Sequence, residues 1–285
     1  MMQRSDPAAA LGIPRSSRHR AGMDIPSRLP SLFLSHGSPV LAVEDSPAGR
    51  FLDGLGTKLP RPRAIVVASA HFMARRPSIG AAAHPATVHD FGGFPALLYQ
   101  IRYPAPGDAD LAAVVAARLA NAGLAPDLLP NHGIDHGVWV PLRRMYPQAD
   151  IPVVPLSVDP HADAAHHFAV GRALASLRED GVLVVGSGGF VHNLGDLDWD
   201  HKDAPMPDWA AEFARWMRER LATHDIDALL DWERQAPNPR RAHPTVEHLM
   251  PLFVALGAGG DSPTVRSLHR SQEFGSLALD AFAFD

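Results

Sequence analysis

Short apolar runs alternate along this chain with longer segments of helical periodicity, and this alternation constrains the fold more than any other feature. The apolar runs are rich in Val, Ile and Leu and cover residues 32–34, 64–68, 151–158 and 181–186. Runs of this length and composition are typical of strands buried on both faces. Helical patterns cover residues 108–122, 162–179, 207–223 and 246–256. The alternation predicts an α/β fold, a single domain with a mostly parallel central sheet and helices on both faces.

Residues at the ends of two of these helical patterns support the assignment. Asp108 and Asp163 stand where helix N-caps are expected, and Gly123 and Gly181 stand where helices should stop. No fixed-period repeat, long linker or charge block divides the chain, so one domain over residues 29–285 is the simplest organisation.

The first 28 residues differ in composition from the rest. They contain five arginines together with Ser and Pro, and they lack an apolar stretch long enough for a secretory signal. Such a segment can bury little apolar surface, so residues 1–28 are predicted to be a disordered N-terminal extension that is dispensable for folding and activity.

Composition excludes several classes of protein. The chain has no cysteine, which rules out disulfide scaffolds, iron–sulfur clusters, cysteine-ligated zinc and thiol nucleophiles. The net charge of -5 argues against a nucleic-acid-binding surface. No apolar run approaches the roughly 20 residues that a membrane helix needs, so we expect no membrane partner and a cytoplasmic protein.

Histidine is the outlier, with 16 copies, and the placement of some of them indicates a metal site. His36, His71 and His192 each follow an apolar strand pattern, and in open α/β sheets ligands bind beyond the carboxyl ends of the strands. Imidazole suits iron, zinc and copper, and ligands from separate strand ends can converge without a local motif. Two further groups are His132 with His136 in a Gly-rich turn, and His243 with His248 at a predicted helix start. The histidines without such context are assigned to the surface: His19, His161, His166, His167, His201, His224 and His269.

Seven segments carry a resemblance to a known family. In chain order they are LFLSHGSPV, IVVASAHF, HDFGGFPALLYQIRYPAPGD, DHGVWVPLRRMYP, DIPVVPLSVD, GSGGFVHNLGDL and PTVEHLMPLFVALGA. Together they resemble the 4,5-DOPA extradiol dioxygenase-like family of the class III extradiol ring-cleavage superfamily, from about Leu32 to the C-terminus. The resemblance implies one α/β domain that binds one non-haem metal ion, iron(II) when active and often zinc as isolated.

Carried over position by position, the resemblance makes His36, His71 and His248 metal ligands. It places His192 at the metal, either as a further ligand or as the adjacent acid/base, and it places His136 in the pocket. Glu247 precedes His248, and neighbours on a helical turn point about 100° apart, so one of the two should face the metal. The resemblance favours His248.

The chemistry implied is extradiol cleavage of a small catechol, DOPA-like or caffeate-like, by dioxygen. A facial set of three ligands leaves positions open for both reactants. An imidazole, His192 or His136, would move the protons. Two alternatives stay open at this point: a zinc-dependent hydrolase at the same histidines, and a non-enzymatic interaction protein on the same scaffold.

Overall fold

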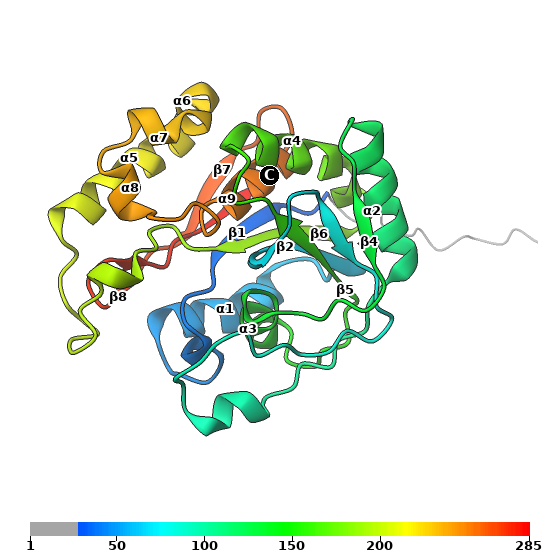
Figure 1. The fold of residues 1–285 in the computed structure, drawn as a ribbon, viewed down its shortest axis with the longest axis horizontal. Helices are drawn as coiled ribbons and strands as arrows, with labels where there is room; N and C mark the ends of the chain where they lie inside the picture. The colour runs from blue at the N-terminus through cyan, green and yellow to red at the C-terminus, as the bar shows by residue number, and fades with distance from the viewer. Residues whose placement is uncertain (1–27) are drawn as a thin grey trace, which may run out of the picture.

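The computed structural model describes residues 28–285, whose centre is an eight-stranded sheet in the order β4-β3-β5-β2-β6-β1-β10-β7 (Figure 1). The strands are β1 (Ser31–Ser35), β2 (Ala64–Met73), β3 (Ser78–Gly80), β4 (Asp127–Leu129), β5 (Val153–Val158), β6 (Val182–Gly188), β7 (Val265–His269) and β10 (Ala281–Phe284). A separate two-stranded sheet pairs β8 (Gln272–Glu273) with β9 (Leu277–Ala278).

The four central strands β5, β2, β6 and β1 run parallel to one another. They coincide with the four predicted apolar runs to within two residues at their starts, and β1, β5 and β6 are buried along their whole length. Both flanks join this parallel core through an antiparallel pair, β3 with β5 on one side and β10 with β1 on the other. At the outer edges, β7 pairs with β10 antiparallel and β4 pairs with β3 in parallel. The predicted mostly parallel sheet is therefore confirmed, with antiparallel additions at both sides that the apolar runs did not indicate.

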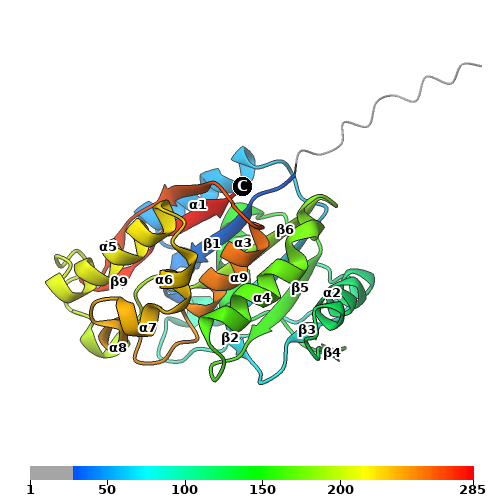
Figure 2. The same cartoon turned by 90° about the horizontal axis from the view of Figure 1, so that it is seen from above.

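Helices cover both faces of the sheet. On one face lie α2 (Ala109–Asn121), α4 (Ala164–Leu174) and α9 (Met250–Ala258), with α4 packed along α9 (Figures 1 and 2). On the other lie α1 (Pro47–Lys58) and α3 (His136–Met145). A further group packs against α9 and the C-terminal strands through one apolar cluster: α5 (Asp208–Ala222), α6 (Ile226–Leu230), α7 (Trp232–Gln235) and α8 (Pro239–Ala242).

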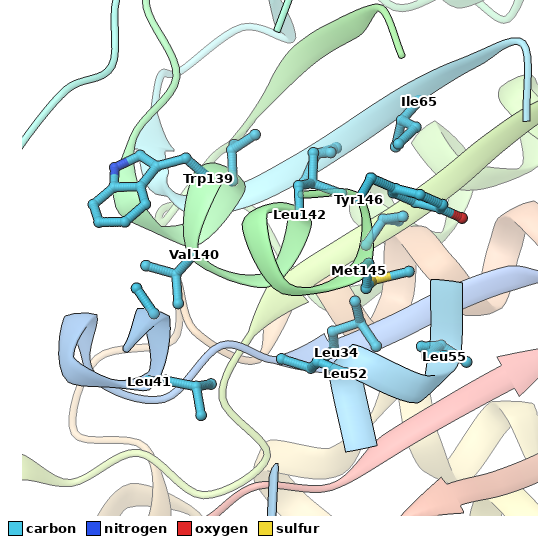
Figure 3. Packing of buried hydrophobic residues seen from close by; sticks show 14 of the residues in the cluster. Leu34, Leu41, Leu52, Leu55, Ile65, Trp139, Val140, Leu142, Met145 and Tyr146 are labelled. Carbon is cyan, nitrogen blue, oxygen red and sulfur yellow. The ribbon is translucent and has the colours of Figure 1, made fainter. Parts of the chain in front are cut away.

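Helix α3 packs between α1 and the sheet. Its Trp139, Leu142 and Met145 are almost fully buried, in one cluster with Leu52 of α1 and Ile65 of β2 (Figure 3). This packing fixes α3 at the point where its first residues reach the carboxyl ends of the strands. The sequence pattern did not reveal α3, which carries a proline inside it and a glycine in its first turn.

The predicted helix caps are present, but two helices are shorter than predicted. The side chains of Asp108 and Asp163 accept hydrogen bonds from Leu111 N and His166 N, and Gly123 has a φ of 79°. The segment predicted as one helix to residue 179 changes to a 3₁₀ turn, η3 (Ala175–Arg178). The helix predicted from residue 246 begins only at Met250, so the residues before it form a turn.

The predicted N-terminal extension lies outside the described residues, apart from Arg28. Tertiary contacts are present before the first strand, because Leu29 is 1% exposed and exchanges hydrogen bonds with Arg178. Leu29 N donates to Arg178 O at 3.3 Å, and Arg178 Nε donates to Leu29 O at 2.5 Å.

Two truncations should therefore behave differently. Removing residues 1–27 is expected to leave the free energy of unfolding unchanged. Removing residues 1–30 should lower it by about 1–3 kcal/mol, because the buried Arg178 guanidinium loses an acceptor and Leu29 no longer covers apolar surface. Urea denaturation of both proteins beside the full chain measures this, and equal midpoints for the two truncations would contradict it.

The surface assignment of the remaining histidines holds only in part. His161, His201 and His224 are exposed, His166 and His269 are half-buried, and His19 lies outside the described residues. For His167 the assignment is wrong, since its side chain is 1% exposed and its Nε2 accepts from Asp159 N at 3.1 Å. Burial lowers the pKa of His167 to about 4, so it is a neutral core residue. Within residues 28–285, no helix has the length and apolarity needed to cross a bilayer.

Candidate metal centre

A cavity of about 230 Å³ opens beyond the carboxyl ends of β1, β2 and β6, where an α/β sheet is expected to bind its ligand. Six polar side chains that can exchange protons or bind a metal line it: His36, His71, Asp90, His136, His192 and His248. The rest of the lining is mainly apolar: Pro39, Phe91, Phe94, Leu194, Leu197, Trp199, Phe274 and Leu277, with Gly37 and Ser38.

Backbone geometry brings three of these histidines together. His36 directly follows β1, and its N–H donates to Gly188 O at 3.0 Å. His71 lies near the end of β2, past the last residue paired with β6. His248 stands in the turn before α9, and Gly188 permits its approach, because a Cβ on Gly188 would lie 2.1 Å from the His248 carbonyl oxygen.

The imidazoles of His36, His71 and His248 converge. One ring nitrogen from each lies within 4.8 Å of the others, and the Nε2 atoms of His36 and His71 are 3.0 Å apart. His36 is 2% exposed and His248 is 6% exposed, so the cluster lies at the bottom of the cavity.

The tautomer of His36 is set by its neighbours. Its Nδ1 lies 3.1 Å from Ser187 Oγ, whose own hydroxyl proton is donated to the Gly137 carbonyl. The Ser187 oxygen must therefore accept from the His36 Nδ1–H, which leaves Nε2 with a free lone pair.

Carboxylates set the tautomers of the other two histidines. Glu247 Oε1 lies 3.0 Å from His248 Nδ1, and Asp90 Oδ2 lies 3.3 Å from His71 Nδ1. A carboxylate accepts the Nδ1 proton and orients the ring, an arrangement typical of metal-bound histidine. Glu247, which the sequence left as a rival for the third ligand position, thus contacts the ring of His248.

These residues fit a bound metal ion. Two Nε2 lone pairs 3.0 Å apart repel each other unless a cation lies between them. The His248 Nε2 is buried and has no hydrogen-bond partner within the described chain. A buried acceptor without a partner is costly, and a cation shared by three neutral imidazoles satisfies all three nitrogens. The structure thus supports metal binding by this histidine set.

Burial keeps the three rings neutral. It lowers the pKa of His36 and His248 well below the usual value, and the neighbouring imidazoles act in the same direction. Burial also lowers the pKa of His71 to about 3, with further lowering from His136 that Asp90 partly offsets. Neutral imidazole is the form that binds metal, so the ligand set is ready at pH 7.

Asp90 joins His136 to this cluster. Its Oδ2 lies 3.0 Å from His136 Nδ1, and its Oδ1 accepts from the His136 backbone N–H at 2.9 Å. Burial opposes ionisation of Asp90, but the hydrogen bonds and charge of His136 outweigh it and lower the pKa of Asp90 to about 2. His136 is the first residue of α3, held by the Asp135 N-cap. With Nδ1 facing Asp90, Nε2 is the His136 nitrogen left for a ligand.

His192 lies beside the cluster rather than within it. Its ring stacks on that of His248, with centroids 3.5 Å apart and planes 6° from parallel. Its backbone N–H donates to Ala242 O at 3.0 Å, which anchors the turn after β6. Over residues 28–285, the sets of side chains close enough to share a metal are His36–His71–His248 and His71–Asp90–His136, and neither contains His192.

The two remaining histidines of the predicted groups lie away from the cavity. His243 is buried, and its Nε2 contacts Phe190 O at 3.2 Å. His132 stacks on Phe72 with centroids 3.6 Å apart. Both have structural contacts and neither lines the cavity.

Sequence reasoning missed Asp90 and Ser187 as partners of the histidines. Asp90 lies in the motif HDFGGFPALLYQIRYPAPGD, which follows no apolar strand run, so the strand-end argument did not single it out. Ser187 directly follows the apolar run 181–186 that precedes His192, a strand-end position like those that pointed to the histidines.

Comparison with known proteins agrees with this site. Residues 30–279 match the family described as the catalytic LigB subunit of aromatic ring-opening dioxygenase. The chain is 40% identical over 258 residues to a 4,5-DOPA dioxygenase extradiol from Beta vulgaris, covering 89% of this chain and 96% of the relative. It is 41% identical over 259 residues to the protein of that name from Escherichia coli K12, covering 89% and 93%.

A solved structure is also similar. The crystal structure of the uncharacterized protein JW3007 from Escherichia coli K12 superimposes with a TM-score of 0.77 at 35% identity, covering 90% of this chain and all of that one. The family match spans every strand of the main sheet except β10, and it includes every histidine of the cavity. The chain therefore belongs to the LigB family of aromatic ring-opening dioxygenases.

Proposed function

We propose that this protein opens the ring of a small catechol, DOPA-like or caffeate-like, outside its two adjacent hydroxyls, with incorporation of both atoms of dioxygen. One observation carries the proposal: three neutral imidazoles converge at the bottom of a cavity whose walls are largely apolar and aromatic. Curated relatives named extradiol dioxygenases support the reaction class. Apolar walls suit both an aromatic ring and dioxygen.

We propose His36, His71 and His248 as the ligands of iron(II) in the active protein, with zinc able to occupy the same site after isolation. When bound, the iron would hold the catechol oxygens and dioxygen side by side and let electrons pass between them. Ser187, Asp90 and Glu247 would keep the ligand rings in the required tautomer.

We propose His192 and His136 for proton transfer. A catechol must lose a hydroxyl proton on binding, and the oxygenated ring must later regain one. His192 faces the cavity from the His248 side, and His136 Nε2 faces it from the Asp90 side, so the two could serve opposite edges of the bound ring. We assign the acid/base role to His192 and substrate orientation to the His136–Asp90 pair.

Ring opening itself gives the test of this function. Protein loaded anaerobically with iron(II) should consume one dioxygen per catechol without added reductant and yield a coloured semialdehyde. A colourless diacid would indicate cleavage between the hydroxyls instead. Hydrolysis of esters or amides by the zinc protein, without oxygen uptake by the iron protein, would favour the hydrolase alternative.

The geometry already weighs against that alternative. Zinc hydrolases that attack esters or amides commonly use a free carboxylate as the base beside the bound water. Glu247 Oε1 contacts both His248 Nδ1 at 3.0 Å and Thr245 Oγ1 at 2.9 Å, and Asp90 is engaged with two histidines. Both carboxylates at the site therefore accept hydrogen bonds from imidazole rings.

Replacing Glu247 with glutamine is expected to weaken metal binding about tenfold, because a neutral amide is a poorer acceptor for the His248 Nδ1–H. Competition with a chromophoric chelator measures the change. Glu233→Gln is the matched control, since Glu233 pairs with Arg240 on the exposed surface. Equal metal affinity in the two variants would show that Glu247 does not contribute to metal binding.

A further inference from the structure

The mouth of the cavity determines what a bound catechol can carry on its ring. If the two hydroxyls lie at the histidines, a substituent on the far side of the ring points outward past Leu194, Trp199 and Phe274. We infer, on the basis of the function proposed above, that the protein selects catechols whose ring substituent bears no net negative charge, which favours the zwitterionic DOPA-like class over the anionic caffeate-like class.

The side chains at the mouth are apolar and held in place. Leu194 is 52% exposed and Trp199 is 59% exposed, yet both line the cavity. The Trp199 and Phe274 ring centroids are 5.2 Å apart, and Asp198 N donates to Phe274 O at 3.0 Å. These contacts fix the segment after η4 (Leu194–Asp196) on the β8–β9 hairpin, so a substituent meets a preformed apolar surface.

No cation is placed to receive an anion there. Among residues 28–285, no lysine or arginine lines the cavity, and Asp90 is its sole carboxylate. Cations beside the walls are already engaged: Lys202 with two glutamates, Arg241 Nε with Asp196 Oδ2 at 2.7 Å, and Arg102 with backbone carbonyls.

The mouth segment adds negative charge of its own. Residues 196–203 contain four aspartates against one lysine. Asp196 pairs with Arg241 and Asp198 contacts His201, which leaves Asp200 and Asp203 without an ion pair among residues 28–285. A carboxylate bound at this mouth would lose hydration against Trp199 and Leu194, gain no counter-ion and be repelled by the aspartates. A neutral substituent of the same shape avoids all three costs, so charge rather than size decides the preference.

A matched pair of substrates tests the inference. 3-(3,4-Dihydroxyphenyl)propanoate and its primary amide have the same ring and nearly the same shape, and differ in charge. With the iron-loaded full chain we expect kcat/KM for the amide to exceed that for the acid by roughly tenfold, mainly through KM, because the contact is the same in ground and transition states. Anaerobic titration of both compounds should give the same order of affinities.

A charge placed at the mouth should reverse the order. Leu194→Arg is expected to raise kcat/KM for the acid relative to the amide by roughly tenfold, and added salt should reduce this gain by screening. Leu128→Arg is the control, because Leu128 is 46% exposed on the edge strand β4 and does not line the cavity. It should leave the amide preference as in the unaltered protein.

The outcomes separate the inference from the proposed function. If neither compound is ring-opened, the proposed function fails, and the anaerobic affinities still decide the charge preference. If the unaltered protein prefers the acid, or binds and turns over both equally, the inference is overturned. It is also overturned if Leu194→Arg changes the acid-to-amide ratio no more than Leu128→Arg does.

Discussion

Replacing His248 with alanine is expected to empty the metal site and to lower kcat/KM by at least about 1,000-fold, a loss of several kcal/mol of stabilisation by the metal. His248 contributes the buried Nε2 that has no partner in the described chain. Without it, His36 and His71 are left as two ligands, too few to hold the ion against water.

Elemental analysis of the purified variant, after circular dichroism has shown that it is folded, measures the metal content. The same result is expected for His36→Ala and His71→Ala. His132→Ala is the matched control, because His132 is half-buried but stacks on Phe72 outside the cavity, so it should keep full metal content. A folded His248→Ala protein with one metal per chain would refute the ligand set.

Replacing His192 with phenylalanine is expected to lower kcat about 10²- to 10⁴-fold while the metal content stays at one per chain. Phenylalanine keeps an aromatic ring stacked on His248 and removes only the nitrogens that can move a proton. The variant therefore separates proton transfer from ring packing.

This second result also decides the choice that the sequence left open for His192. If His192→Phe loses the metal together with activity, His192 is a ligand and the acid/base role falls to His136. His136→Gln is the companion variant, expected to keep its metal and to lose rate through misplacement of the substrate. Full activity in His192→Phe would exclude His192 from the chemistry altogether.

Local patterns were sufficient for the central part of the fold. The strands β1, β2, β5 and β6 were recognisable because a strand buried on both faces must be apolar at every position. The caps of α2 and α4 were recognisable because Asp108 and Asp163 satisfy backbone N–H groups within three residues of themselves. The antiparallel strands β7 and β10 were not, because their pairing depends on partners far away in the chain.

Local sequence patterns were enough to predict which residue types gather at the site: histidines at the carboxyl ends of parallel strands, in motifs resembling one family. The distances between these histidines and the identity of their hydrogen-bond partners follow from tertiary packing. It separated His248 from His243 and placed Asp90 between His71 and His136. The tertiary structure also showed Ser187 setting the tautomer of His36, and it revealed an apolar cavity mouth that no lysine or arginine of residues 28–285 lines. The physical reason is that strand ends are positions that a local pattern can reveal, whereas the contacts of a ring nitrogen depend on how distant segments pack.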